Sequence, residues 1–266
     1  MSKKRKRRTT YVGLFGILVI FIVVMAKQDP LFASSRESYR ASDQVKDESF
    51  LDRARSVTKR DGKVNIVVLG SSVTLGLGAT DAQPVWGTLL ENHLNQLEGI
   101  QTQVINMGYS GYSTADLLAK NKISHVLKAK PDIIIFELCL INNNRYPQNS
   151  IEQTKADISS IMQTFQDKLP NTLVLLQSAN PTIYNDVILA DGKVTYDQYN
   201  KEVTRFVRAN DWNYIDIYEL MNERIEQNDA KVERLLNDHV HPNGDGYRLW
   251  YDLLEERLDK PLRTLR

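Results

Sequence analysis

Near the C-terminus, an aspartate and a histidine stand three residues apart, a spacing that suits proton transfer. They are Asp238 and His241, and Pro242 and a turn follow them. In an Asp-x-x-His loop the carboxylate can bond one imidazole nitrogen, stabilise the imidazolium that forms, and leave the other nitrogen facing a nucleophile. The alternative interpretation is a helix cap for Asp238 and a surface position for His241. If the two side chains act together, they form a general base with its orienting carboxylate.

A serine in a Gly-bounded segment is a candidate nucleophile for that base. Ser72 lies in Gly70–Gly78 (GSSVTLGLG), directly after a short β-branched run. A sharp turn between a strand and a helix holds such a serine among backbone N–H groups, which can stabilise an oxyanion. Serine is a weak nucleophile and needs a base. Turns of this kind also bind phosphate, but this one has no Lys where a P-loop needs it.

Two further segments could contribute to a pocket. Gly108 and Gly111 lie in the segment NMGYSGYS, where glycine would let the backbone approach a ligand closely. A simple tight turn is the alternative there. Asn142, Asn143 and Asn144 follow the most apolar run of the chain, and an amide at that place can donate a hydrogen bond into a pocket. Asparagine also favours turns and caps, so a capped loop is the alternative.

Strand-like and helix-like segments alternate from residue 63 onward. The predicted strands are Val64–Gly70, Thr102–Gly108, Asp132–Leu140, Thr172–Ala179 and Asn213–Tyr218. The predicted helices cover about Val85–Gly99, Thr114–Ala129, Ile151–Lys168, Tyr196–Asn210 and Gly246–Leu258. Strands that are apolar on both faces are buried on both sides, and alternation with helices implies a parallel sheet. We therefore expect a three-layer α/β domain around five parallel strands.

This topology predicts where the chemistry lies, because sites in open parallel sheets form at the carboxyl ends of the strands. Three of the four candidate segments directly follow a predicted strand. The fourth precedes the last helix and could fold back over the same edge. The four segments together therefore support an active site at this edge more strongly than any one of them does.

The pattern resembles the SGNH hydrolases, also called the GDSL family, over about residues 63–258. Gly70–Thr74 (GSSVT) is similar to the first block of the family, Gly-Asp-Ser-Leu, which puts the nucleophile at Ser72. Ser71 stands where the family has Asp. Gly108 corresponds to the oxyanion-hole glycine of the second block.

The remaining blocks are matched to different degrees. Leu140–Asn143 is loosely similar to the third block, Gly-x-Asn-Asp, and lacks its Gly and its Asp. Asn142 corresponds to the oxyanion-hole asparagine, and Asn143 could serve in its place. Asp238 and His241, followed by Pro-Asn, closely match the last block.

The resemblance implies a flavodoxin-like α/β/α sandwich and a serine esterase that needs no metal or organic cofactor. Ser72 would attack an ester carbonyl while His241 takes its proton and Asp238 orients the imidazole. The N–H groups of Ser72 and Gly108 and the amide of Asn142 would hold the oxyanion.

The substrate expected is a short acyl ester, such as an O-acetyl group, on an extracellular glycan, because no long apolar lid segment is visible in the sequence. Asn143 and Tyr146 are candidates for substrate binding. Lipid ester hydrolysis by a lysophospholipase-like enzyme, acyl transfer to a sugar hydroxyl, and a non-catalytic carbohydrate-binding module are the alternatives. The sequence does not predict an oligomeric state.

The first residues predict export of this domain. Residues 1–10 contain six consecutive cations, and residues 11–26 are uncharged and apolar. By the positive-inside rule, this predicts a membrane anchor with a cytoplasmic N-terminus and an external domain; a cleaved signal peptide is the alternative. Residues 27–61 are polar and read as a stalk with a short helix, and residues 62–266 as the hydrolase domain.

Charge and cysteine content exclude other classes of protein. The six-residue basic run belongs to a total of 34 Lys and Arg, so the rest of the chain, which keeps all 33 Asp and Glu, is acidic. An acidic body is a poor nucleic-acid binder. Cys139 is the only cysteine, so no internal disulfide and no Cys-based metal site can form, and its apolar surroundings predict an inert core thiol.

Overall fold

Five parallel strands form the centre of the domain. They are β1 (Val64–Gly70), β2 (Thr102–Gly108), β3 (Ile133–Glu137), β4 (Leu173–Gln177) and β5 (Tyr214–Ile215), in the order β2-β1-β3-β4-β5. The computed structural model describes residues 48–145, 148–189 and 193–265. All five expected strands are present, so the prediction of a five-stranded parallel sheet is confirmed.

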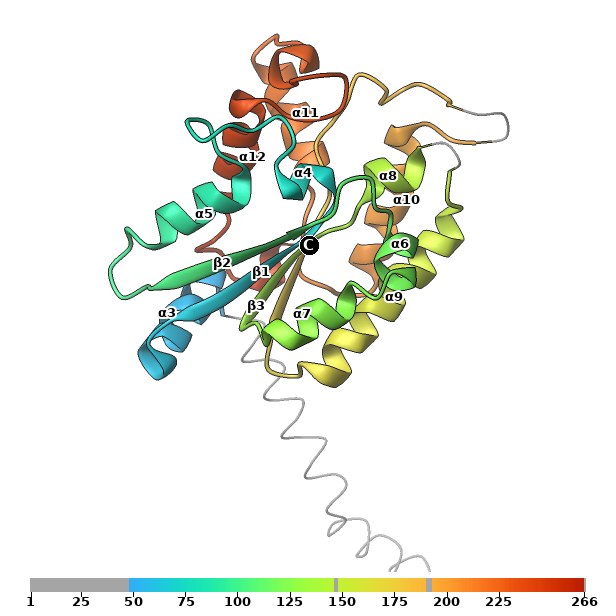
Figure 1. Ribbon diagram of the computed structural model, residues 1–266. Helices are drawn as coiled ribbons and strands as arrows, with labels where there is room; N and C mark the ends of the chain where they lie inside the picture. The colour runs from blue at the N-terminus through green and yellow to red at the C-terminus, as the bar shows by residue number, and fades with distance from the viewer. Residues whose placement is uncertain (1–47, 146–147, 190–192, 266) are drawn as a thin grey trace, which may run out of the picture. The chain divides into compact units, whose positions relative to one another are not determined.

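Helices cover both faces of this sheet (Figure 1). One face packs against α3 (Phe50–Asp61), α5 (Trp86–Leu94), α11 (Ile217–Gln227) and α12 (Gly244–Glu255). The other packs against α6 (Thr114–Ala119), α7 (Ile123–Ala129), α9 (Ile151–Lys168) and α10 (Tyr196–Ala209). The short helices are α4 (Ser72–Leu75), α8 (Leu140–Asn144), and the 3₁₀ helices η1 (Val232–Leu235) and η2 (Leu262–Thr264).

Alternating side chains of each strand enter two separate hydrophobic cores. In β1, Ile66 and Val68 belong to the core on the α5 side, whereas Val67 and Leu69 belong to the core on the α9 side. Successive side chains of a strand point to opposite faces of the sheet, so an uninterrupted apolar run fills both cores. This confirms the three-layer α/β/α arrangement.

Three elements differ from the sequence-based expectation. The expected helix at residues 114–129 is two helices, because the chain turns at Asn121 with a positive φ of 53°. The third strand ends at Glu137, and Cys139 begins α8 in a left-handed conformation. The fifth strand pairs over only two residues, because the side chain of Asp216 accepts a hydrogen bond from the N–H of Glu219 and starts α11.

Helix α3 belongs to the compact unit, which extends from Glu48 to Arg266. Ser49 and Asp52 form a capping box at its start, and Phe50, Ala54 and Val57 are buried against the sheet. The compact unit thus begins before the expected boundary between stalk and domain at residues 61 and 62. The short helix expected in the stalk is part of this unit because its apolar face has a core to pack on.

The chain enters this unit at the edge of the sheet where the strands begin. The hydroxyl of Thr58 in α3 donates to the carbonyl of Gln101, directly before β2, and Arg53 donates to the carbonyl of Asn171, just before β4. Helix α3 therefore lies at the amino ends of the strands, opposite the edge where the candidate site is expected.

The expected basic segment and membrane anchor, residues 1–10 and 11–26, lie outside the described residues. Among the helices that the structure describes, none is long and apolar enough to cross a bilayer. Cys139 is buried, which agrees with its expected place in the core, and both burial and the nearby Glu137 raise the pKa of its thiol well above the usual value.

Candidate active site

The structure brings Ser72, His241 and Asp238 into one hydrogen-bonded chain. Nε2 of His241 lies 3.0 Å from Oγ of Ser72, and Nδ1 of the same ring lies 2.8 Å from Oδ2 of Asp238. The two ring nitrogens thus face the two partners that a nucleophile–base–carboxylate triad requires. Ser72 is 5% exposed, so the hydroxyl is sheltered although it lies at the carboxyl end of β1.

The second carboxylate oxygen of Asp238 stabilises the conformation of the Asp-x-x-His loop. Oδ1 accepts hydrogen bonds of 2.7 Å from the backbone N–H groups of Val240 and His241. Burial alone would raise the pKa of Asp238, but these two N–H groups and the His241 ring outweigh it and lower the pKa to about 2. The carboxylate is therefore ionised at neutral pH and favours the Nδ1–H tautomer of His241.

Two neighbouring segments support the loop from outside. The side-chain amide of Asn180, which follows β4, donates a 2.9 Å hydrogen bond to the carbonyl of Val240. Gly78 has a positive φ of 89°, and a Cβ there would overlap the carbonyl oxygen of Pro242. The Gly-bounded turn after β1 and the Asp-x-x-His loop thus touch each other directly.

Ser72 is the first residue of α4, and its backbone N–H donates no hydrogen bond to another described residue. The first N–H groups of a helix have no partner within the helix, so they are available to an anion. Gly70 allows this turn to close, because a Cβ there would overlap Thr74 and Glu137. The sequence thus places an N–H group with no described partner on the candidate nucleophile itself.

The predicted oxyanion donor Gly108 is engaged elsewhere in the structure. Its N–H donates 2.9 Å to Oδ1 of Asn106, whose Nδ2 donates to the carbonyl of Thr74. A Cβ on Gly108 would overlap the backbone of Leu75, so glycine at this position permits the close contact between β2 and α4. The N–H of Gly111, by contrast, donates to none of the described residues.

The two candidate asparagines have different surroundings. Asn142 is 7% exposed, and its Nδ2 donates 2.9 Å to the carbonyl of Tyr112, next to Gly111. Asn143 is fully buried, and its Oδ1 accepts a 2.9 Å hydrogen bond from the N–H of Thr114 at the start of α6. Asn143 therefore supports α6 rather than lining a pocket, while Tyr146 lies outside the described residues.

One buried residue beside the triad was not predicted. Glu137 ends β3 with no exposed surface and accepts hydrogen bonds from the backbone N–H groups of Ser71 and Cys139. The signal in the sequence is a single carboxylate within the most apolar strand. Because Glu is almost never fully buried without partners, that position marks a polar cluster at the strand end.

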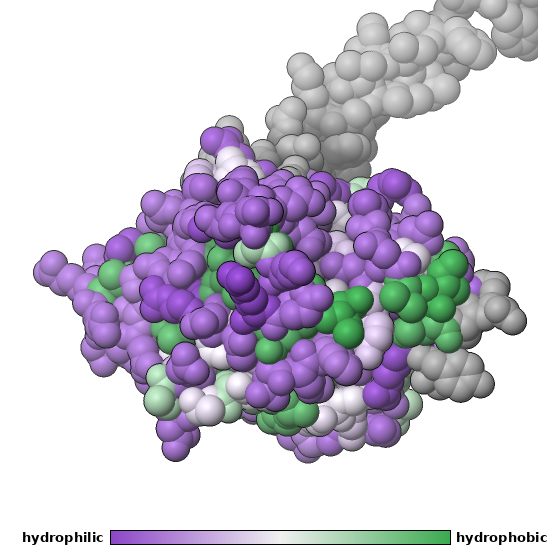
Figure 2. Space-filling view, turned by 90° about the horizontal axis from the view of Figure 1, so that it is seen from above, coloured by the Kyte–Doolittle hydropathy of each residue, from purple (hydrophilic) through white to green (hydrophobic). Residues whose placement is uncertain are grey.

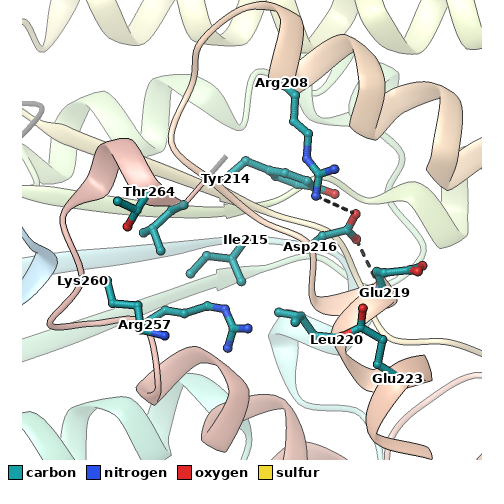
Figure 3. Close-up of a pocket in the computed structure, with 11 residues that line it drawn as sticks. Arg208, Tyr214, Ile215, Asp216, Glu219, Leu220, Glu223, Arg257, Lys260 and Thr264 are labelled. Carbon is teal, nitrogen blue, oxygen red and sulfur yellow. Dashed lines mark hydrogen bonds and ion pairs between the residues drawn. The ribbon is translucent and has the colours of Figure 1, made fainter. Parts of the chain in front are cut away.

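A separate cavity of about 300 Å³ lies beside β5 and includes none of the triad residues (Figure 3). Within it Arg208 pairs with Asp216 at 3.8 Å, so the charges nearest the strand are matched. No group of His, Cys, Asp and Glu that could hold a metal ion is found within the described ranges.

Several solved structures share this fold. Axe2, an acetylxylan esterase from Geobacillus stearothermophilus, is 16% identical with a TM-score of 0.59, over 75% of this chain and 95% of its own. The acetyl xylan esterase AlAXEase is 19% identical, with a TM-score of 0.58, over 73% of this chain and 98% of its own. A two-domain esterase (CEX) active on acetylated mannans is 18% identical with a TM-score of 0.61, over 82% of this chain and 55% of its own.

The sequence comparisons address the family directly. No curated protein matches the chain. The family profile described as GDSL-like Lipase/Acylhydrolase matches residues 68–249, which include the end of β1, all of β2 to β5, the turn that carries Ser72 and the loop that carries His241. The chain therefore belongs to the GDSL-like lipase/acylhydrolase family and is a hydrolase that acts on ester bonds.

Proposed function

We propose that this protein is a serine esterase that removes short acyl groups, chiefly O-acetyl esters, from glycans outside the cell. The observation that carries the proposal is the continuous chain from Asp238 through His241 to Ser72, with distances of 2.8 Å and 3.0 Å. Both distances lie within the reach that proton transfer needs before substrate binds.

The geometry supports a two-step reaction. Nε2 of His241 takes the Ser72 proton as the hydroxyl oxygen attacks the ester carbonyl, and then gives that proton to the departing alcohol. Water attacks the acyl-enzyme by the same route and releases the acid and the free serine. The ionised Asp238 stabilises the imidazolium in both steps.

Three groups are proposed to bind the oxyanion. The free N–H of Ser72 and the side-chain amide of Asn142 are two of them. We assign the third to the N–H of Gly111, since the N–H of Gly108 would first have to leave Asn106. Each such donor lowers the barrier by about 3 kcal/mol.

Two features favour an acylated glycan over a lipid. The structurally similar proteins described above are named as esterases of acetylated xylan and mannan. Figure 2 shows the domain from above relative to the view of Figure 1. The face seen there is mostly hydrophilic, with apolar side chains in separate patches. Enzymes that work on a lipid surface need a continuous apolar contact area.

Helix α3 places the start of the described unit away from the candidate site. The described unit begins at Glu48, at the amino ends of the strands, whereas Ser72 and His241 lie at the carboxyl end of β1. An external position of this domain is part of the proposal. Removal of the domain by protease added to intact cells would test this external placement, and full protection would contradict it.

The full chain should be assayed on p-nitrophenyl acetate, butyrate and octanoate and on acetylated xylan, beside Ser72→Ala. Activity on acetate and xylan that disappears in the variant supports the proposal. A clear preference for octanoate would shift the substrate to lipids. Absence of Ser72-dependent hydrolysis would overturn the hydrolase proposal and leave acyl transfer or glycan binding.

A further inference from the structure

Glu137 is a fully buried carboxylate at the end of β3, directly beneath the candidate site. Oε2 accepts a 2.7 Å hydrogen bond from the N–H of Ser71 and a 3.2 Å bond from the hydroxyl of Thr74. Oε1 accepts a 2.7 Å hydrogen bond from the N–H of Cys139. The three donors occupy both oxygens of the carboxylate.

These donors belong to the two elements that carry the reacting groups. Ser71 and Thr74 lie on either side of Ser72, at the start and within α4. Cys139 caps the start of α8, the helix that carries Asn142. One side chain thus joins the turn of the nucleophile to the turn of a proposed oxyanion donor.

The second of these turns needs such a support. Cys139 has φ 57° and ψ 24°, a left-handed conformation that is strained for a non-glycine residue. Its N–H is bound to Oε1 of Glu137, and its carbonyl accepts the N–H groups of Asn142 and Asn143. The hydrogen bond that the N–H of Cys139 donates to Glu137 therefore holds Cys139 in the conformation from which α8 starts.

We propose that Glu137 is a positioning residue that sets the separation between the Ser72 nucleophile and the Asn142 oxyanion donor. This inference rests on the proposed serine mechanism and goes beyond it, because Glu137 touches neither the triad nor the substrate.

The surroundings of Glu137 favour a carboxylate over a neutral side chain that would only fill the space. The groups that bond Glu137 are two backbone N–H groups and the hydroxyl of Thr74, and none of them carries a positive charge. Burial raises the pKa of Glu137, and the hydrogen bonds from Ser71, Cys139 and Thr74 oppose that rise. A fold that needed only volume here would be better served by an apolar side chain, since burying a carboxylate is costly.

The substitution Glu137→Gln separates positioning from filling of space. Glutamine has the same shape but only one acceptor oxygen, so its NH₂ group must face either the Ser71 or the Cys139 N–H. One of the two hydrogen bonds is then lost, and one turn is free to shift. A misplacement of about 1 Å lowers kcat by about 100-fold.

The experiment compares the full-length wild type, Glu137→Gln, Glu137→Asp and the control Asp157→Asn. Asp157 is also a buried carboxylate, 4% exposed, and bonds Thr114 and Gln153 away from Ser72. For each protein, kcat and KM on p-nitrophenyl acetate, the rate of Ser72 labelling by a fluorophosphonate, and the Tm are measured.

We expect Glu137→Gln to lower kcat and the labelling rate about 100-fold with KM nearly unchanged, and Asp157→Asn to lower the Tm without this loss of kcat. Glu137→Asp keeps the charge but is one methylene too short to reach both turns, so it should show the same kcat defect. This variant takes the place of Glu137→Gln in the comparison if Glu137→Gln does not fold. A kcat within twofold of wild type in a folded Glu137 variant would overturn the inference. A wild type that neither turns over nor becomes labelled would overturn the serine mechanism itself, and the inference with it.

Discussion

The imidazole of His241 lies 3.0 Å from the hydroxyl of Ser72, although 169 positions separate the two residues in the sequence. The contact forms because the turn after β1 and the loop before α12 both end at the same edge of the sheet. The backbone contact between Gly78 and Pro242 brings these two segments together.

Replacing Asp238 by Asn should lower kcat by about 10⁴-fold, because an amide can favour the wrong tautomer of His241. The measurement is kcat on p-nitrophenyl acetate at pH 8, with circular dichroism to confirm the fold. A loss smaller than tenfold would mean that His241 does not depend on this carboxylate.

Asp238 should also make stability depend on acidic pH. Its pKa in the folded protein is about 2, below the usual value of 3.8, so the unfolded chain binds the proton first as the pH falls. The stabilisation is complete above about pH 5 and is lost as the pH falls from about 4 to 2. The difference in free energy of unfolding between wild type and Asp238→Asn should therefore shrink from pH 6 to pH 3. A difference that does not change with pH would contradict this assignment.

Replacement of Asn142 by Ala should mainly lower activity, whereas replacement of Asn143 by Ala should mainly lower stability. Asn142→Ala should lower kcat by about 100-fold, because it removes the proposed oxyanion donor, and it should lower the Tm less than Asn143→Ala does, because it leaves only the carbonyl of Tyr112 without its side-chain donor. Asn143→Ala should lower the free energy of unfolding by about 1–3 kcal/mol, because the buried N–H of Thr114 loses its acceptor. Kinetics and thermal unfolding of both variants decide the point, and the reverse pattern would exchange their roles.

Gly108→Ala should destabilise the fold by about 3 kcal/mol, since the new Cβ overlaps the backbone of Leu75. Gly62 is the matched control, because its φ is 83° but a Cβ there meets nothing within 4 Å. Gly62→Ala should therefore cost only the left-handed strain, about 1 kcal/mol. Urea unfolding of both variants measures the difference, and equal losses would show that the β2–α4 contact is unimportant.

Periodicity and strand-end logic predict most of this fold from the sequence. The apolar runs of β1 to β4 and the long patterns of α9, α10 and α12 are strong local signals. The boundaries that differ depend on tertiary contacts. Helix α3 reads as polar until a core buries Phe50, and the end of β3 is decided by the bonds between Glu137 and Cys139.

The residues of the site also differ in how far the sequence alone predicts them. Ser72, Asp238 and His241 are suggested by short motifs, and the structure places them together. The roles of Gly108 and Asn143 could not be read from the motifs, because they depend on which partner each N–H or amide meets in space. Glu137 shows only as a carboxylate in an otherwise apolar strand, and two of its partners, Ser71 and Thr74, lie more than 60 positions away in the chain.

The most direct test of the account is release of acetate from acetylated xylan by the full-length protein, beside Ser72→Ala and the control Ser124→Ala in α7. We predict that the wild type and Ser124→Ala release acetate at similar rates and that Ser72→Ala is slower by at least about 1,000-fold. Equal rates for Ser72→Ala and the wild type would contradict a nucleophilic role for Ser72 and, with it, the proposed mechanism.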